Sequence, residues 1–311
     1  MAKVLVTGGA GFIGSHLCER LVSEGHEVLC LDNLDPYYSP EVKKENLKGL
    51  DCRLVKADIR DAKAVDRILK TENPEYVIHE AAQAGVRASV QDPLKTSEVN
   101  VQGTLNLLEA VRGSDVKKVV YASSSSVYGK VVRLPFDEGH PTDPISPYGV
   151  SKLACEHYFR VYGELHGIDS VGLRYFTVYG PRIRPDLAIH KFTRTALEGG
   201  QLEVYGDGSK SRDFTHVSDA VDATVKAMAK GSGIYNVGGG TTITVKELAE
   251  RIIAQVGTGT IKYVPDQKGD VEHTESDTSK ARKELGWRPK KTFEEGLKET
   301  VEWVRKIYNV L

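Results

Sequence analysis

The chain has 311 residues, about twice the length of a typical domain, so one large domain or two modest ones could each bury a core. Its 42 Lys and Arg residues nearly cancel its 43 Asp and Glu residues, and the net charge of −1 argues against a nucleic-acid-binding protein. No apolar run approaches the roughly 18 residues of a membrane span, and no secretory signal is visible, so we expect a cytoplasmic protein with no membrane partner.

The first half of the chain alternates short apolar runs with helical patterns. The apolar runs predict strands at Lys3–Thr7, Glu27–Asp32, Arg53–Lys56, Tyr76–His79, Lys118–Ala122 and Ser170–Arg174. The patterns between them predict helices at Phe12–Glu24, Asp61–Thr71, Leu94–Arg112 and Pro147–His166. Strand–helix alternation at this spacing favours right-handed crossovers and a parallel sheet covered on both faces. The sequence therefore predicts an α/β fold with a doubly wound, Rossmann-like sheet.

The regular alternation of strands and helices ends after about Tyr175. The later elements predicted are helices at Ile189–Glu198, Val217–Ala229, Val245–Gln255 and Val301–Tyr308, and strands at Leu202–Tyr205 and Ile234–Val237. The helix from Val217 and the strand from Ile234 resemble returns to the first domain. We therefore expect a nucleotide-binding domain of residues 1–176 and 217–240. A smaller, discontinuous C-terminal substrate domain would comprise residues 177–216 and 241–311.

Three glycines, Gly8, Gly11 and Gly14, follow the first strand and open the first helix in the segment VTGGAGFIG. Glycine permits a tight turn, lets backbone amides approach a pyrophosphate and allows the helix to pack close to the sheet. Asp32 ends the next strand, where its carboxylate can accept both hydrogen bonds of a ribose diol and would repel a 2′-phosphate. The alternative is a solvated Asp in a loop. Together these features predict an NAD site.

The G-x-x-G-x-x-G spacing resembles the extended branch of the short-chain dehydrogenases/reductases. The resemblance implies that the cofactor is NAD and that it is bound by Gly8, Gly11, Phe12, Ile13, Gly14, Asp32, Asn33, Asp58, Ile59, Ala81, Ala82, Gln83, Asn100, Ser124, Tyr148, Lys152 and Phe176. The chain departs from the family at Glu80, where an apolar residue commonly precedes the Ala-Ala pair.

Tyr148 and Lys152 lie four residues apart in SPYGVSK and so share one face of a helix. A phenol is a poor base at neutral pH, and a nearby ammonium group favours its ionised form. Such a pair on an exposed helix face is common, but here it follows a nucleotide cradle and a strand that ends near Ser124. The three side chains match the catalytic Ser–Tyr–Lys triad of the same family, which implies that they are the catalytic residues.

The whole chain resembles the nucleotide-sugar epimerases and dehydratases of this branch. In the 4,6-dehydratases an Asp-Glu pair follows the triad serine, whereas this chain has Ser125 and Ser126, whose hydroxyls cannot do the proton chemistry of dehydration. The segments His79–Val90 and Phe176–Ile189 resemble the UDP-glucuronate 4-epimerases most. The resemblance implies NAD-dependent epimerisation at C4 of a UDP-sugar, through a transient 4-keto form. UDP-glucose 4-epimerase and a non-catalytic NAD-binding regulator are the alternatives.

Candidate substrate-binding residues follow from the same resemblance. A 6-carboxylate would suit the small donors Ser125, Ser126 and Thr177, and Arg87, Arg184 and Lys191 are nearby cations that could equally be solvated loop charges. Arg212 matches a pyrophosphate-binding arginine, Asp270 a ribose-binding aspartate, and residues 202–205, which include Val204 and Tyr205, would line the uracil.

Two further expectations concern partners and packing. In this family two helices, here Leu94–Arg112 and Pro147–His166, pair with their symmetry mates, which implies a homodimer through a four-helix bundle. The apolar positions Val101, Leu105, Leu108 and Val111 suit that contact, but they would equally suit packing on the sheet. Trp287 in LGWRP is expected to be buried in domain packing. The spacing of the cysteines and histidines predicts no metal site.

Overall fold

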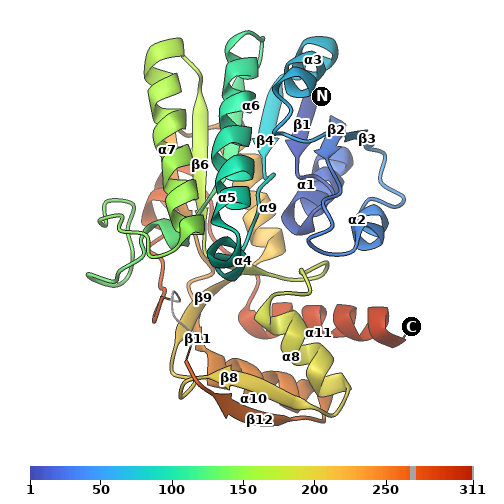
Figure 1. Ribbon diagram of the computed structural model, residues 1–311, viewed down its shortest axis with the longest axis vertical. Helices are drawn as coiled ribbons and strands as arrows, with labels where there is room; N and C mark the ends of the chain where they lie inside the picture. The colour runs from blue at the N-terminus through green and yellow to red at the C-terminus, as the bar shows by residue number, and fades with distance from the viewer. Residues whose placement is uncertain (267–270, 310–311) are drawn as a thin grey trace.

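The computed structural model describes residues 1–266 and 271–309. Its centre is a seven-stranded sheet in the order β10-β6-β5-β4-β1-β2-β3, and every pair of neighbouring strands is parallel. Helices cover both faces of this sheet, with α3, α6 and α7 on one side and α1 and α9 on the other (Figure 1). The predicted doubly wound, Rossmann-like fold is confirmed.

The seven strands lie close to their predicted bounds. They are β1 (Lys3–Thr7), β2 (Glu27–Asp32), β3 (Arg53–Lys56), β4 (Tyr76–His79), β5 (Lys118–Ser124), β6 (Ser170–Tyr175) and β10 (Gly233–Val237). Strands β1 and β2 are buried along almost their whole length, as expected for strands with helices on both faces. Strand β5 runs two residues further than predicted and ends on Ser124.

The helices that cover the sheet are α1 (Phe12–Ser23), α3 (Ala62–Glu72), α6 (Gly103–Arg112), α7 (Pro147–His166) and α9 (Val217–Ala229). The single helix predicted from Leu94 to Arg112 is wrong, because the segment divides into α5 (Pro93–Ser97), a π-helical turn (Glu98–Gln102) and α6. In that turn Asn100 accepts a hydrogen bond from the Gln83 backbone at 2.7 Å, a tertiary contact that local sequence does not reveal. Two short helices were not predicted, α2 (Pro40–Asn46) and α4 (Val86–Gln91).

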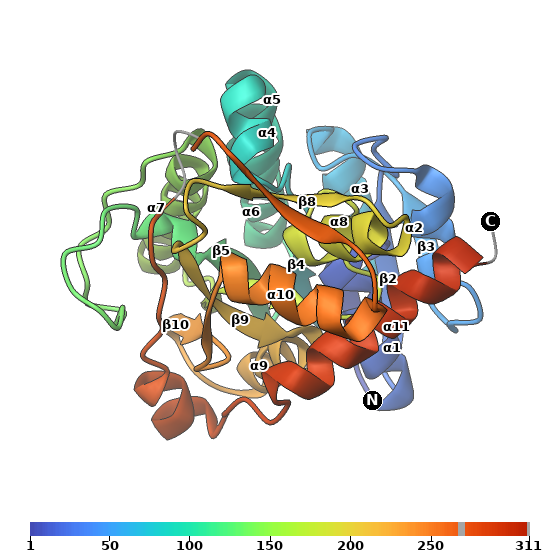
Figure 2. The same cartoon turned by 90° about the horizontal axis from the view of Figure 1, so that it is seen from below.

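The remaining elements gather beyond the carboxyl ends of the large sheet, as Figures 1 and 2 show. They are the three-stranded sheet of β11 (Thr242–Thr244), β9 (Ser211–His216) and β7 (Thr177–Tyr179), the parallel pair of β12 (Thr260–Val264) and β8 (Gln201–Tyr205), and the helices α8 (Ala188–Leu197), α10 (Val245–Val256) and α11 (Phe293–Asn309). We call these elements the small lobe. Two single turns complete the described chain, Ser125–Val127 and Ala281–Leu285.

The final helix, α11, begins eight residues before its predicted start. Thr292 and Glu295 explain the difference, because the Glu295 backbone N–H donates to Thr292 Oγ1 at 3.3 Å and the Thr292 N–H donates to Glu295 Oε2 at 3.1 Å. This reciprocal pair satisfies two backbone donors at a helix start. The T-x-x-E spacing that encodes it is visible in the sequence.

Helix α9 and strand β10 belong with the large sheet although they follow the first part of the small lobe in sequence. β10 pairs with β6, and α9 packs against α1. Trp287 is fully buried, as expected, and its indole N–H donates to the carbonyl oxygen of Asp219 on α9 at 3.0 Å. The division into domains of residues 1–176 with 217–240 and 177–216 with 241–311 stays a prediction. Among the described helices, none has both the length and the apolar composition to cross a membrane.

Candidate active site

A cleft of about 420 Å³ opens at the carboxyl ends of the large sheet, between the sheet and the small lobe. The strand ends Asp32, Ser124 and Tyr175 line it, as do Thr177 and Arg212 from the small lobe. Ligands of open α/β sheets bind at this edge because the loops and helix N-termini converge there. The cleft therefore brings together residues predicted to bind the cofactor and residues predicted to bind the substrate.

The glycine loop approaches the neighbouring backbone more closely than any side chain allows. Gly8 has a φ of +69°, and a Cβ atom there would lie 2.7 Å from the backbone nitrogen of Ala81. A Cβ atom on Gly14 would lie 2.2 Å from the carbonyl oxygen of Gly8. The loop thus fits the cradle that a dinucleotide pyrophosphate requires, at the N-terminus of α1. Gly11, Phe12 and Ile13 also line the cleft, as predicted.

Two carboxylates, those of Asp32 and Asp58, line the part of the cleft where the adenosine of NAD is expected to bind. Asp32 is buried and lines the cleft, where it accepts hydrogen bonds from the backbone N–H groups of Ala10 at 3.1 Å and Leu34 at 2.8 Å. Asp58 receives hydrogen bonds from Asn33 Nδ2 at 2.8 Å and from two nitrogens of the Arg60 guanidinium. The Arg60 hydrogen bonds hold the pKa of Asp58 well below its usual range, so this carboxylate stays charged.

The loop after β4 forms the opposite wall. Ala81, Ala82 and Gln83 line the cleft, as predicted. Asn100, predicted to contact the cofactor, is not among the lining residues; its amide nitrogen donates to Ser151 Oγ at 2.9 Å, while its oxygen holds the Gln83 backbone. Asn100 therefore ties α7 to the loop, and a direct cofactor contact by Asn100 stays a prediction.

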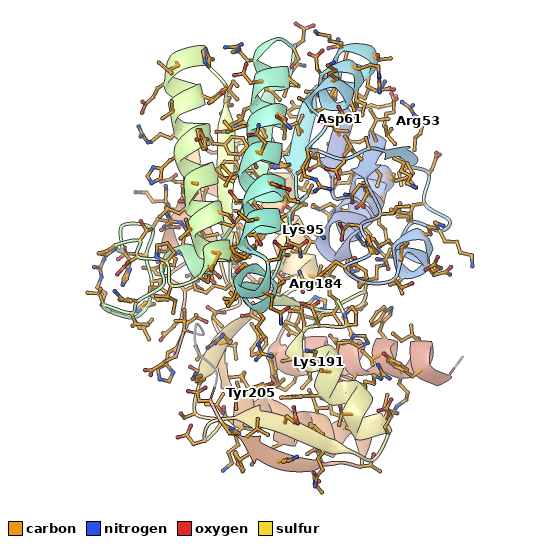
Figure 3. The ribbon with its side chains drawn as sticks, in the orientation of Figure 1. Arg53, Asp61, Lys95, Arg184, Lys191 and Tyr205 are labelled. Atoms are coloured by element: carbon orange, nitrogen blue, oxygen red, sulfur yellow. The ribbon has the colours of Figure 1, made fainter. Side chains whose placement is uncertain are left out.

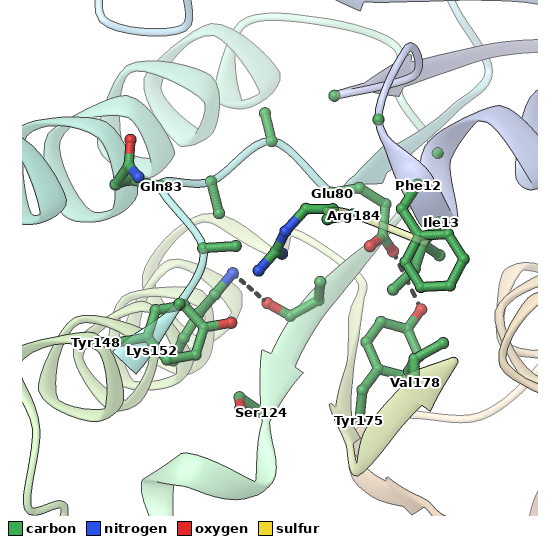
Figure 4. Close-up of a pocket in the computed structure, with 18 of the residues that line it drawn as sticks. Phe12, Ile13, Glu80, Gln83, Ser124, Tyr148, Lys152, Tyr175, Val178 and Arg184 are labelled. Atoms are coloured by element: carbon green, nitrogen blue, oxygen red, sulfur yellow. Dashed lines mark hydrogen bonds between the residues drawn. The ribbon is translucent and has the colours of Figure 1, made fainter. Parts of the chain in front are cut away.

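The three predicted catalytic side chains meet in the cleft (Figure 4). Lys152 Nζ lies 5.9 Å from the centroid of the Tyr148 ring and donates to the Ala122 carbonyl oxygen at 2.8 Å. Ser124 Oγ accepts a hydrogen bond from the Ser126 backbone N–H at 3.1 Å. Since that bond uses only a lone pair of the hydroxyl oxygen, the Ser124 hydrogen can donate to a substrate oxygen.

Local sequence places Tyr148 at the start of α7. Ser146 caps the helix by accepting the Gly149 backbone N–H at 3.1 Å, and Pro147 occupies the first helical position. A Cβ atom on Gly149 would lie 2.4 Å from the carbonyl oxygen of Ser126. Glycine at this position thus allows the helix to pack directly against the turn that follows Ser124.

The predicted substrate residues divide into two groups. Ser125, Ser126, Thr177 and Arg212 line the cleft. Four others, Arg87, Lys191, Val204 and Tyr205, are not among the lining residues, and Asp270 lies outside the described residues. The Arg87 guanidinium lies 4.7 Å from the centroid of the Tyr205 ring, and Lys191 is exposed on α8; Figure 3 shows Lys191 and Tyr205 on the small lobe. Their contacts with substrate stay predictions.

Arg184, weighed from the sequence only as one of three cations, reaches into the cleft from the loop before α8. Its guanidinium makes two hydrogen bonds to the Asp186 carboxylate, both at 2.9 Å. Tyr37 donates to the same carboxylate at 3.1 Å. A bidentate pair of this kind is geometrically well defined and largely neutralises the arginine charge.

Several lining residues were missed from the sequence, among them Tyr38 and Lys43 beside the glycine loop and Glu80 after β4. Lys43 is buried on α2 with its Nζ 4.8 Å from the centroid of the Tyr38 ring. A local signal could have revealed α2, because Ser39 caps it and Pro40 takes its first position. Glu80 stood out in the sequence as a departure from the family, but its contact with Tyr175 arises only because β4 and β6 lie on either side of β5.

Comparison with known proteins agrees with this geometry. Residues 5–300 match a protein family described as GDP-mannose 4,6 dehydratase. The chain belongs to this family of extended short-chain dehydrogenases/reductases. One relative, the UDP-glucuronate 4-epimerase of Thermodesulfobacterium geofontis, is 40% identical over 98% of this chain and 97% of its own length.

Two solved structures are similar over nearly their whole length. UDP-glucose 4-epimerase from Thermotoga maritima, with UDP-glucose, is 38% identical with a TM-score of 0.93, covering 98% of this chain and 99% of that one. UDP-glucuronic acid 4-epimerase from Bacillus cereus, with UDP-glucuronic acid and NAD, is 33% identical with a TM-score of 0.93, covering 98% and 100%. The chain thus groups with the NAD-dependent UDP-sugar 4-epimerases, which are isomerases. The described residues hold no cluster of His, Cys, Asp or Glu able to bind a metal ion.

Proposed function

We propose that this protein inverts C4 of a UDP-sugar with NAD as its cofactor, and that its substrate pair is UDP-glucuronate and UDP-galacturonate. The family and the cleft geometry support the 4-epimerase activity. The substrate assignment depends on one observation above all. Three small hydroxyl side chains, those of Ser125, Ser126 and Thr177, line the cleft together with Tyr148.

The chain's own residues supply the proton chemistry. NAD, when bound, accepts a hydride from C4 and returns it. Tyr148 takes the proton of the 4-hydroxyl and later gives it back, which makes it the general base and then the general acid. Lys152 places its ammonium group beside the Tyr148 ring, and the Ala122 carbonyl oxygen holds its Nζ in place. Ser124 donates its hydroxyl hydrogen to the sugar oxygen and fixes its orientation.

Inversion requires the 4-keto sugar to present its other face before the hydride returns. The diphosphate must therefore stay anchored while the hexose turns. Arg212 lines the cleft, and a guanidinium suits phosphate oxygens. We assign the diphosphate to Arg212 and the uracil to the neighbourhood of Val204 and Tyr205.

Neutral donors suit a hexuronate for a chemical reason. The 4-keto form of a glucuronate is a β-keto acid, which readily loses carbon dioxide. Hydroxyl groups on Ser125, Ser126 and Thr177 can hold the carboxylate in one orientation. Arg184, which lines the cleft, is paired with Asp186, so its charge is already balanced. We infer that orientation by neutral donors suppresses the loss of carbon dioxide.

UDP-glucose is the second candidate substrate. The similarity to the Thermotoga maritima enzyme favours it, since that neighbour has a higher identity to this chain than the Bacillus cereus enzyme has. The same hydroxyl side chains could also bind a 6-hydroxyl group. A non-catalytic NAD-binding regulator would have no need of the Tyr148–Lys152 pair, and both residues line the cleft, which argues against this alternative.

Incubation with each sugar nucleotide separately tests the assignment. Purified protein is given UDP-glucuronate or UDP-glucose, and the products are separated by chromatography. We expect UDP-galacturonate from the first and much slower formation of UDP-galactose from the second. Faster conversion of UDP-glucose would overturn the substrate assignment and leave the 4-epimerase activity intact. No conversion of any UDP-sugar would overturn both.

We also propose that the protein is a homodimer. Two apolar side chains, Leu94 in α5 and Leu165 near the end of α7, are 76% and 70% exposed. Leu108 and Val111 are buried in the chain's own core, so they are not available to a partner. Light scattering during size-exclusion chromatography should give twice the mass of one chain, and the mass of a single chain would contradict the proposal.

A further inference from the structure

Glu80 is a carboxyl group in the cleft that the epimerisation mechanism does not use. It follows directly after β4, whose last residue, His79, contacts Thr7 and Thr104. Glu80 instead contacts β6, where its Oε1 lies 3.0 Å from the Tyr175 hydroxyl oxygen. Figure 4 shows Glu80 and Tyr175 together, close to Phe12 and Ile13 at the start of α1. The carboxyl group therefore lies at the base of the cofactor half of the cleft.

The hydrogen bonds around Tyr175 need one more hydrogen than the hydroxyl groups supply. Tyr175 Oη lies 3.0 Å from Glu80 Oε1 and 2.6 Å from Thr224 Oγ1, and Thr224 Oγ1 lies 2.8 Å from the Ala220 carbonyl oxygen. Tyr175 and Thr224 provide two hydrogens for these three contacts. A protonated Glu80 supplies the third, so that Glu80 donates to Tyr175, Tyr175 to Thr224 and Thr224 to the carbonyl oxygen of Ala220.

Burial gives this arrangement its energetic weight. Tyr175 and Thr224 are both buried, where a hydrogen bond that is not made is costly. With an ionised Glu80, Tyr175 donates to the carboxylate and Thr224 has one hydrogen for two contacts, so either the Tyr175–Thr224 contact or the Thr224–Ala220 contact lacks its hydrogen. The neutral carboxyl group completes the whole chain of hydrogen bonds.

Burial and the neighbouring polar groups act in opposite directions on the pKa of Glu80. Burial raises the pKa of Glu80 to about 7, although the Lys152 ammonium and the Tyr175 hydroxyl both act to lower it. Helix α1 presents the apolar side chains of Phe12 and Ile13, and α9 presents the neutral Thr224. Arg184 reaches into the same cleft, paired with Asp186. Glu80 is thus poised between its two protonation states near neutral pH.

We propose that Glu80 senses the charge of the nicotinamide ring, keeping its proton beside the neutral reduced ring and releasing it to solvent beside the cationic oxidised ring. The inference rests on the proposed function, in which NAD occupies the cleft and Lys152 holds the nicotinamide ribose. Lys152 and Glu80 are close enough for the ammonium charge to act on the carboxyl group. Glu80 is therefore a residue that sets the preference for NAD over NADH.

The sign of the pH effect follows from linkage. An ionised Glu80 attracts the cationic ring and has no such attraction for the neutral one, so the preference for NAD rises with pH. With a pKa of about 7 beside the reduced ring, the ratio of the two affinities rises by up to about tenfold between pH 6 and pH 8. The two cofactors carry the same phosphates and differ in the charge of the ring, and comparison with a Glu80 variant separates the share of Glu80 from that of Tyr148 and Lys152.

The test measures the dissociation constants of NAD and NADH at pH 6, 7 and 8, by displacement of radiolabelled NAD from the holoenzyme. Wild-type protein should show the tenfold rise in the NAD-to-NADH preference. Glu80→Gln keeps a hydrogen-bond donor for Tyr175 but cannot ionise, so its preference should be the same at all three pH values. Glu75→Gln is the matched control, because Glu75 precedes the opposite end of β4 and pairs with Lys117; it should behave as the wild type.

A second measurement follows the proton itself. Infrared difference spectra between the oxidised and borohydride-reduced holoenzyme should show a protonated-carboxyl band gained on reduction. The band should be absent in Glu80→Gln and present in Glu75→Gln. A wild-type preference independent of pH, or a carboxyl band that persists in Glu80→Gln, would overturn the inference while leaving the 4-epimerase proposal intact. A protein that binds neither cofactor would overturn the proposed function instead.

Discussion

The cofactor half and the sugar half of the cleft differ in how many of their predicted residues line it. The glycine loop and the residues after β4, predicted to bind the cofactor, line the cleft. On the sugar side, Ser125, Ser126 and Thr177 line it, whereas Arg87, Lys191, Val204 and Tyr205 are not among the lining residues. The glycine loop of the cofactor half is one continuous motif that acts through its backbone. The sugar half is built from side chains that separate loops and lobes bring together.

The largest expected effect is on kcat, and it comes from Tyr148, which lies where the cofactor half and the sugar half of the cleft meet. Tyr148→Phe removes the proton-transferring hydroxyl, so kcat should fall by about 10²–10⁴-fold. Bound NAD and the free energy of unfolding should stay near the wild-type values, measured by cofactor release and denaturant titration. Tyr158→Phe, on the exposed side of the same helix, is the control and should retain full activity. Full activity in Tyr148→Phe would eliminate this residue as the acid–base group.

The backbone cradle can be broken by one methyl group. In Gly14→Ala the new Cβ atom would lie 2.2 Å from the Gly8 carbonyl oxygen. The loop must shift, so we expect loss of co-purified NAD and a decrease of about 1–3 kcal/mol in the free energy of unfolding. Gly113→Ala has its nearest neighbouring atom at 4.0 Å and should leave both unchanged. Normal NAD content in Gly14→Ala would show that the cradle tolerates displacement.

Lowering the pH should decrease the free energy of unfolding through one buried histidine beside the cofactor half and one in the small lobe. Burial lowers the pKa of His79, beneath the cofactor loop, to about 3 and that of His190, in the small lobe, to about 4. Each histidine takes up a proton near pH 6.5 only in the unfolded chain, so stability is lost as pH falls below 6.5. Each should contribute a loss of about 2 kcal/mol between pH 7 and pH 5.

Urea unfolding at pH 7 and pH 5 measures this loss. His79→Gln and His190→Gln should each remove their own share of the acid sensitivity, whatever their stability at pH 7. If one variant retains the full wild-type difference between the two pH values, its histidine is protonated in the folded protein. Comparing His79→Gln with His190→Gln would then show which of the two histidines makes the fold sensitive to acid.

On the sugar side, Thr177→Ala removes one proposed donor to the hexuronate carboxylate. A hydrogen bond to a charged group contributes about 1.5–3 kcal/mol, so KM for UDP-glucuronate should rise by at least about tenfold. KM for UDP-glucose should change far less. Thr242→Ala, exposed on β11, serves as the control. Equal changes for both sugars would count against recognition of the carboxylate by Thr177.

The smallest effect concerns product distribution. Ser125→Ala loosens the carboxylate of the 4-keto sugar, so we expect a few per cent of decarboxylated product where the wild type gives almost none. Chromatography of the sugar nucleotides after complete conversion measures the ratio. An unchanged ratio would mean that other groups orient the carboxylate.

Prediction from the sequence succeeded where the pattern was local. The strand bounds of β1 to β4 and the helix over Pro147–His166 agree with the structure residue by residue. The helix predicted over Leu94–Arg112 failed because a long-range contact of Asn100 accompanies a π turn. Strands β7, β9, β11 and β12 were missed because none of them shows a continuous apolar run. β7 and β11 have three residues each, β9 has the largely polar sequence SRDFTH although it is buried, and β12 is exposed along most of its length.

The sequence by itself determined the parallel sheet, the glycine cradle and the Tyr148–Lys152 pair, since periodicity, backbone freedom and helical spacing act between near neighbours. Only the tertiary structure decided that Arg184 enters the cleft already paired with Asp186, and that Glu80 meets Tyr175 beneath the cofactor site. Both depend on the direction of side chains from distant elements. Such directions, and the low-dielectric surroundings that set the protonation of Glu80, arise only when the chain has packed.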